Sequence, residues 1–247
     1  MSYDEFAGCY DFLTINVGYK ARTAFLLSLF ERYDRRPKLL LDMACGTAEF
    51  STLFAKENIE VIGVDPSCAM LSVAREKICE AQVDVLLLCQ KASELELYGT
   101  VDGAVCCLDS LNHITDYDEL IASFKRISLF LEPQRLFIFD LNTIYKHKEV
   151  LSGQTFIYDT DEVYCVWQNS KCDENGLVNI DLDFFIPNEQ DLYCRSSESF
   201  CERAYNKEQI AVCLKKSRLE VVAILGDMSY SEPSEMEERV IYVTRKV

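Results

Sequence analysis

Short apolar runs recur along the first 150 residues, and amphipathic stretches separate them. The runs are almost continuously apolar, which is typical of parallel strands that are covered on both faces. We predict strands over Leu39–Asp42, Ile59–Asp65, Val83–Cys89, Val101–Leu108 and Leu136–Leu141.

The stretches between these runs carry apolar residues at helical spacing. One helix is predicted over Ala24–Phe30, ending before Pro37, and others begin at Thr47 and after the capping residue Ser67. A further helix begins at Asp116, because Leu120, Phe124, Ile127 and Leu131 share one helical face. The alternation of strand and helix predicts βαβ units and a parallel sheet with right-handed crossovers.

The pattern changes near residue 151. Ile180–Phe184 alternates strictly between apolar and polar residues, which indicates a half-buried antiparallel strand. Asn175-Gly176 is a strong hairpin signal, and a second turn is expected at Pro187–Glu189. We predict three or four antiparallel strands between Gly153 and Tyr205.

The α/β pattern then returns. Asn206 caps a helix that extends to about Lys216, and strands follow at Glu220–Leu225 and Arg239–Thr244. The fold class predicted is α/β, a doubly wound, seven-stranded Rossmann-like sheet with a small antiparallel β insertion. Residues 1–150 and 206–247 form the α/β domain with an aromatic N-terminal arm (Tyr3, Phe6, Tyr10, Phe12 and Tyr19), and residues 151–205 form the insertion.

Composition places this fold in a reducing compartment. The twelve cysteines include no CxxC pair, and neither of the two histidines lies at metal-ligand spacing from a cysteine. No run approaches the ~20 apolar residues of a membrane helix, and the first residues lack the features of a signal peptide. We expect free thiols, no metal and a cytoplasmic location.

The net charge of −16 argues against binding to nucleic acid or to an anionic membrane. The insertion carries eleven acidic and three basic residues, a net −8. These acids are most simply solvated strand faces. The alternative hypothesis is that they favour an amine or another cationic substrate.

Candidate chemistry lies at the predicted ends of the strands. The first strand ends at Asp42 and is followed by a tight turn around Gly46 and a helix N-terminus, where backbone N–H groups can meet a ligand. Asp65 ends the second strand, 19 residues past Gly46, at the distance where a carboxylate accepts from a ribose diol. The spacing therefore predicts a ribose-containing cofactor.

The composition of the turn narrows the cofactor. A dinucleotide site requires GxGxxG, whereas this turn has only Gly46, followed by Thr47 and Ala48. Asp42 would repel a diphosphate but could accept a hydrogen bond from an ammonium group. A cationic nucleoside without phosphate fits better, and S-adenosylmethionine is one such ligand.

The segments Leu39–Ala48, Val64–Leu71 and Asp102–His113 together resemble the class I S-adenosylmethionine-dependent methyltransferases. The resemblance covers most of the chain. It is closest to a small bacterial branch with a β insertion before the last helix, which is similar to small-molecule N-methyltransferases.

The resemblance implies roles for specific residues. Asp42, Ala44 and Gly46 line the methionine portion of S-adenosylmethionine, and Asp65 binds the ribose. The adenine contacts are Pro66, Met70, Lys91, Ala92 and Leu108, with Gln90 and Asp109 at the same strand ends. Two positions depart from the family pattern: Ala48 replaces a glycine, and Lys91 replaces an acid that accepts from the adenine amino group.

The remaining candidates concern the methyl transfer itself. The rings of Tyr10 and Tyr19 could stabilise a sulfonium. His113, just past the fourth strand, is the best candidate for a general base, with Asp109 and Asp140 behind it, whereas His147 is expected at the surface.

The function predicted is methyl transfer to a nitrogen or oxygen of a small molecule, with S-adenosylhomocysteine as product. A noncatalytic protein that senses S-adenosylmethionine and, with less support, a nicotinamide-dependent oxidoreductase remain as alternatives. The acceptor is open, and so is the choice between a monomer and a homodimer.

Overall fold

A seven-stranded sheet forms the centre of the protein. The computed structural model describes residues 7, 10–11, 13–188 and 192–247, so Tyr3, Phe6, Phe12 and Glu189 of the predictions above lie outside the described residues. The strand order is β10-β11-β5-β4-β1-β2-β3, and β11 alone runs antiparallel to both of its neighbours. The strands are β1 (Leu39–Met43), β2 (Glu60–Asp65), β3 (Val85–Cys89), β4 (Gly103–Cys106), β5 (Leu136–Asn142), β10 (Leu219–Gly226) and β11 (Arg239–Lys246).

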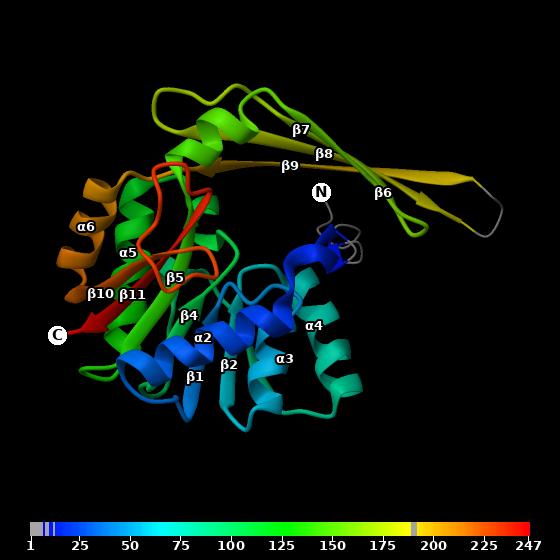
Figure 1. Cartoon of the computed structure of the whole chain (residues 1–247). Coiled ribbons are helices and arrows are strands. Elements are labelled where there is room, and N and C mark those ends of the chain that lie inside the picture. Colours follow the sequence, from blue (N-terminus) through cyan, green and yellow to red (C-terminus); the bar gives the residue numbers. More distant parts are fainter. Residues whose placement is uncertain (1–6, 8–9, 12, 189–191) are drawn as a thin grey trace.

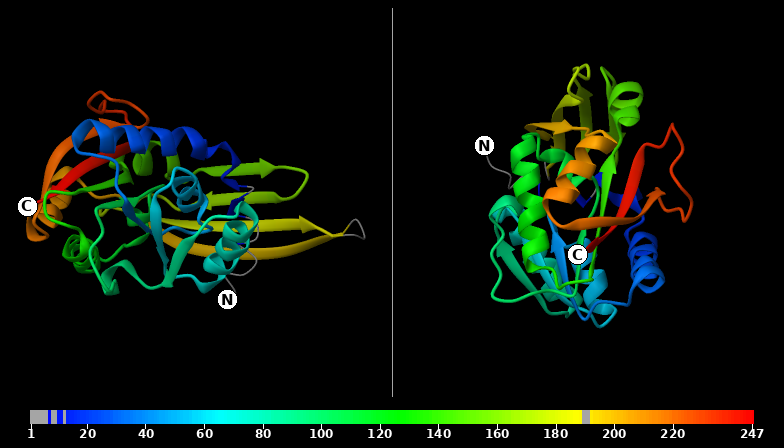
Figure 2. Two further views of the ribbon diagram at one scale, coloured as in Figure 1. Left: turned by 90° about the horizontal axis from the view of Figure 1, so that it is seen from below. Right: turned by 90° about the vertical axis from the view of Figure 1, so that its left-hand side faces the viewer.

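Helices cover both faces of this sheet (Figures 1 and 2). On one face α2 and α3 share a core with the strands, and on the other face α5 and α6 do so. The helices are α2 (Tyr19–Tyr33), α3 (Glu49–Lys56), α4 (Cys68–Ala81), α5 (Tyr117–Phe130) and α6 (Lys207–Lys216). Shorter helical segments are η1 (Ile15–Val17), η2 (Ala92–Glu94), η3 (Ser110–His113) and the π-helical η4 (Lys146–Leu151).

The two cores explain the continuous apolar runs. In β1, Leu40 packs into the core beneath α2 and α3, and Leu41 packs into the core beneath α5. Neighbouring strand residues face opposite sides of the sheet, so a strand between two cores needs an apolar residue at every position. The predicted α/β fold is therefore confirmed, and the two cores explain the apolar runs on which the prediction rests.

The strand order reverses next to β1. This strand pairs in parallel with β2 on one side and with β4 on the other, and the chain reaches these neighbours on opposite faces of the sheet. Crossovers that diverge from one point leave a crevice at the carboxyl ends of the strands. Asp42, which is paired with Val105, lies at that crevice.

The insertion is a separate four-stranded antiparallel sheet. It extends across the carboxyl ends of the central strands, above the N-terminal arm (Figure 1). Its order is β6-β7-β8-β9, with β6 (Thr155–Asp159), β7 (Tyr164–Asn169), β8 (Leu177–Pro187) and β9 (Tyr193–Arg203).

One face of the insertion is apolar. Ile180, Leu182 and Phe184 of β8 are buried, and Leu13 of the N-terminal arm packs against their cluster. Asp181 and Asp183 alternate with them on the opposite face, as the sequence predicted. Most described acids of the insertion are solvated, and only Glu198 and Glu202 share a face with the buried residues of β8.

Two helices begin at positions other than those predicted. The first begins at Tyr19 instead of Ala24, directly after Gly18, whose φ is 71°. The second begins at Glu49 instead of Thr47, because Ala48 has a left-handed backbone with φ 60° and cannot continue a right-handed helix. The described helices include none that is both long and apolar enough to span a membrane.

A glycine at the start of β4 allows the sheet to meet α2 closely. A Cβ built at Gly103 would lie 2.8 Å from the Pro37 Cβ and 3.1 Å from a ring carbon of Phe30. We expect Gly103→Ala to lower the free energy of unfolding by about 1–3 kcal/mol through overpacking. Gly99→Ala is the matched control, since nothing lies within 4 Å of a Cβ there, and it should change stability by under about 1 kcal/mol. Equal denaturation midpoints for the two variants would contradict this account.

Candidate functional site

Four aspartates lie at the carboxyl edge of the central sheet. Asp42 is in β1, Asp65 ends β2, Asp140 is in β5, and Asp109 follows β4. Parallel strands bring their carboxyl ends to one edge, so four acids from distant parts of the sequence become neighbours. Like charges at a buried edge are unfavourable unless cations or donors compensate them.

Arg239 compensates one half of this edge. Its Nη2 donates to Asp109 Oδ1 at 2.6 Å, and its Nε lies 3.7 Å from Asp140 Oδ1. Burial alone would raise the pKa of Asp109, but Arg239, followed by Lys146, holds that pKa below its ordinary value. Burial raises the pKa of Asp140 in spite of Arg239.

The Asp140 carboxylate also shapes the turn after β4. It accepts hydrogen bonds from the backbone N–H groups of Leu108 at 2.8 Å and Asp109 at 2.6 Å. Both residues have left-handed backbones, with φ 55° and 53°. The second oxygen of Asp109 accepts from Asn142 Nδ2 at 2.6 Å, so both Asp109 oxygens have partners within the protein.

The other half of the edge has no such cation. Asp42 is 2% exposed, and its Oδ2 accepts from Ser51 Oγ at 2.5 Å. Asp65 is also buried and accepts from the backbone N–H groups of Gly46 at 2.9 Å and Ser67 at 2.8 Å. Among the described residues, no ion pair joins either carboxylate to a basic side chain.

The pKa values of these two acids reflect their isolation. Burial raises the pKa of Asp42 to about 7, against the opposing hydrogen bond from Ser51. Burial also raises the pKa of Asp65, against the opposing backbone donors of Ser67 and Gly46. A cationic ligand at this half of the edge would be stabilised by both carboxylates.

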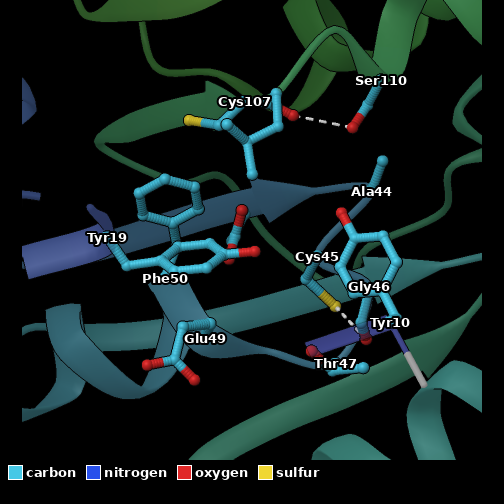
Figure 3. Close-up of a pocket in the computed structure, with 12 residues that line it drawn as sticks. Tyr10, Tyr19, Ala44, Cys45, Gly46, Thr47, Glu49, Phe50, Cys107 and Ser110 are labelled. Carbon is cyan, nitrogen blue, oxygen red and sulfur yellow. Dashed lines mark hydrogen bonds between the residues drawn. The ribbon is translucent and has the colours of Figure 1, made fainter. Parts of the chain in front are cut away.

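A cavity opens at Asp42, between the N-terminal arm and the turn after β1 (Figure 3). Tyr10 and Tyr19 lie on opposite sides of it, and Tyr19 packs edge-on against Phe50 with ring centroids 5.0 Å apart. Six of the predicted residues line it: Tyr10, Tyr19, Asp42, Ala44, Gly46 and Leu108. The other lining residues were not among the predicted cofactor contacts; they are Cys45, Thr47, Glu49, Phe50, Cys107 and Ser110.

The N-terminal arm is fastened across this cavity. Asp11 accepts from Thr47 Oγ1 at 2.7 Å and pairs with Lys77 Nζ of α4 at 2.7 Å. The same ammonium group pairs with Glu49 at 2.9 Å. The cavity has a volume of about 30 Å³ and is partly open to solvent. The arm thus forms one wall of a narrow cavity whose other wall is the turn after β1.

Apart from Leu108, the predicted adenine contacts lie outside the lining of this cavity, and so does Asp65, the predicted ribose contact. Pro66 and Lys91 are exposed, Met70 is buried, and Ala92 begins η2. Gln90 closes a local loop instead, because its side chain accepts from the backbone of Glu96 at 2.9 Å and donates back at 3.3 Å. The structure thus brings the predicted methionine-side residues together around one cavity and leaves the predicted adenine side as an open rim at the ends of β2 and β3.

His113 lies at the end of η3, where the insertion meets the central sheet. Its ring packs against Phe200 of β9 with centroids 5.0 Å apart, and its Nε2 lies 3.6 Å from Glu202 Oε1. The side chain is 47% exposed, so a ligand can reach it.

The prediction for the other histidine is wrong. His147 is completely buried, because η4 turns it beneath the insertion. Its Nδ1 lies 2.9 Å from the carbonyl oxygen of Gly176, in the hairpin turn of the insertion. The sequence gave no sign of this, because the partner is a backbone carbonyl brought near by the tertiary fold.

The two halves of the carboxylate edge predict opposite responses to removal of an acid. The raised pKa of Asp42 means that stability is lost as the pH rises from the unfolded value through about 7. Asp42→Asn should therefore stabilise the unliganded protein at pH 8 by roughly 2–4 kcal/mol and have little effect near pH 4. Asp140→Asn is the control and should destabilise at both pH values, because an amide nitrogen cannot accept from the turn after β4. Thermal unfolding at the two pH values measures both effects. Stabilisation by both variants would contradict the difference between the two halves of the edge.

Comparison with known proteins identifies the family of this chain. A model of the methyltransferase domain matches residues 40–134. A Geobacillus protein that carries the name of a methyltransferase is 31% identical over the whole of both chains. An S-adenosylmethionine-dependent methyltransferase from Clostridium acetobutylicum superposes with a TM-score of 0.89 at 33% identity, over 99% of this chain and 98% of the other. An amino pentose methyltransferase from Micromonospora echinaspora, CalS10, shares the fold with a TM-score of 0.76 at 16% identity, over 96% of each chain. The predicted enzyme class and methyl donor are confirmed, and the chain belongs to the S-adenosylmethionine-dependent methyltransferases.

Proposed function

We propose that this enzyme methylates a nitrogen or oxygen atom of a small molecule, with His113 as the general base. The observation that carries the proposal is a pair of buried carboxylates, Asp42 and Asp65, on the same edge as an accessible histidine. Neither carboxylate forms an ion pair with a basic side chain in the part of the chain that the structure describes. The all-thiol state of the eleven described cysteines supports a reducing, cytoplasmic setting.

The residues at this edge fit S-adenosylmethionine chemically. Asp42, Ala44 and Gly46 would hold its methionine portion, and Asp65 would bind the ribose. Pro66, Met70, Lys91, Ala92 and Leu108 would border the adenine. When bound, the cofactor supplies an electrophilic methyl group on a sulfonium, and the rings of Tyr10 and Tyr19 lie where they can stabilise a cation.

The assignment of His113 as the general base follows from the contacts that the nearby acids already make. Both oxygens of Asp109 are already bonded, and Asp140 holds the turn after β4. His113 is accessible and has no hydrogen-bonded partner at Nδ1 among the described residues. It can therefore accept the proton that an amine or hydroxyl loses as it gains the methyl group.

The acceptor is proposed to bind between His113, the N-terminal arm and the inner face of the insertion. Phe200 supplies an apolar wall there, and burial raises the pKa of Glu198 on the same face. CalS10, a structural neighbour, acts on an amino pentose. An amine on a small polar molecule is the acceptor class that these features favour.

The pKa of Asp42 makes binding of the cofactor pH-dependent. A cationic ligand prefers the ionised carboxylate, so the affinity for S-adenosylmethionine should rise about tenfold between pH 6 and pH 8 and level off above pH 8. Calorimetry below pH 7 should also record proton release in buffers of different ionisation enthalpy. Asp42→Asn should bind more weakly and without this pH dependence. A constant wild-type affinity over this range would remove Asp42 from the cofactor site.

A screen of acceptors tests the reaction. Consumption of S-adenosylmethionine is measured with panels of amines, alcohols and thiols, and turnover is expected with amines or alcohols. On the acceptor found, His113→Gln should lower kcat by roughly 10²-fold or more while calorimetric binding of S-adenosylmethionine is unchanged.

Asp65→Ala is the complementary variant and should lose nucleoside binding. Full turnover by His113→Gln would remove the base assignment. Turnover with thiols alone, or with no panel member while S-adenosylmethionine still binds, would overturn the proposed reaction.

A further inference from the structure

The only two histidines of the chain approach the same carboxylate. Glu202 of β9 is 4% exposed, and its Oε1 lies 3.6 Å from His113 Nε2. Its Oε2 lies 3.6 Å from His147 Nε2, on the buried side of the same side chain. Glu202 thus stands between an accessible ring and a buried one.

The tautomer of His147 follows from its other nitrogen. A carbonyl oxygen can only accept, so the contact of Nδ1 with the Gly176 carbonyl requires a proton on Nδ1. In a neutral ring, Nε2 would then present a lone pair to the Glu202 carboxylate, and two acceptors would face each other in a buried site. His147 Nε2 has no hydrogen-bond partner among the described residues that would relieve this. A proton on His147 Nε2 would give the Glu202 carboxylate a donor on its buried side.

Two further polar groups lie near Glu202. Asn142 Nδ2 donates to Oε2 at 3.4 Å, and the Arg239 guanidinium lies within electrostatic reach of the carboxylate. Oε2 of Glu202 therefore faces Asn142 and His147, and the other oxygen of Glu202 is available as an acceptor for His113.

We propose that Glu202 is a positioning residue for the methyl-transfer reaction. It holds His113 in the tautomer with a proton on Nε2, so that Nδ1 is the basic nitrogen, and His147 braces Glu202 from the buried side. The proposal rests on the proposed role of His113 as the base. It also gives the insertion a part in the reaction, because β9 supplies both Glu202 and the Phe200 ring against which His113 packs.

Nuclear magnetic resonance of histidine-labelled protein tests this without any acceptor. With two imidazole rings in the whole chain, His113→Gln and His147→Gln assign every ring signal. In the wild type at neutral pH we expect a proton on Nε2 of His113 with Nδ1 bare, and a protonated Nε2 on His147.

Glu202→Gln keeps the side-chain size and removes the charge. Its amide can donate to His147, so His147 Nε2 should become a bare acceptor and His113 should lose its single tautomer. Glu198→Gln, on the same face of β9 but not in contact with either ring, should leave both rings as in the wild type. If Glu202→Gln unfolds, the His113 tautomer in His147→Gln provides the same test, since bracing by His147 is required for it.

Wild-type His113 with its proton on Nδ1, or ring signals that are unchanged in Glu202→Gln, would overturn the positioning role. Activity separates this proposal from the one on which it rests. On an acceptor from the screen, Glu202→Gln should lower kcat tenfold or more with little change in the KM for S-adenosylmethionine. The expected spectra together with full activity of His113→Gln would refute the base and leave the tautomer assignment in place.

Discussion

The uneven neutralisation of four aspartates at one edge of the sheet governs this structure. A parallel sheet must bring the ends of its strands together, and here four of the five strands that pair in parallel carry an acid at or just past that end. One guanidinium, that of Arg239, lies against Asp109 and Asp140, and no basic side chain pairs with Asp42 or Asp65 among the described residues. The negative charge without a compensating cation therefore lies on the side where the strand order reverses. Doubly wound folds bind their ligands at that same point.

This division assigns different work to chemically identical residues. Asp140 is structural, because its carboxylate fixes the left-handed turn that ends β4. Asp42 is buried without a cation and is costly to ionise in the free protein. Such a residue lowers the stability of the free protein. A cationic ligand can restore that stability, because its positive charge pairs with the buried carboxylate.

The sequence predicted the central sheet well because the strands face two cores, and that condition leaves an unmistakable run of apolar residues. It also predicted that Asp42, Gly46 and Asp65 gather at the carboxyl edge of the sheet, because these residues have fixed positions relative to those strands. The tertiary contacts were beyond it. Nothing local distinguishes Arg239, at the start of the last strand, as the partner of Asp109, or Glu202 as the buried member of a largely solvated acidic insertion. The surface position predicted for His147 was wrong for the same reason. Ala48 has a left-handed backbone, which an alanine in the sequence does not predict.

The acceptor site that we propose draws on segments outside the central sheet. The N-terminal arm contributes Tyr10, the turn after β4 leads to His113, and the insertion contributes Phe200 and Glu202. Asp11 pairs with Lys77 of α4, and Leu13 packs against the apolar face of the insertion. A shift of the arm would therefore disturb both contacts at once. Tyr10 of the same arm lines the cavity at Asp42, so a ligand bound there would contact an element that is tied both to α4 and to the insertion.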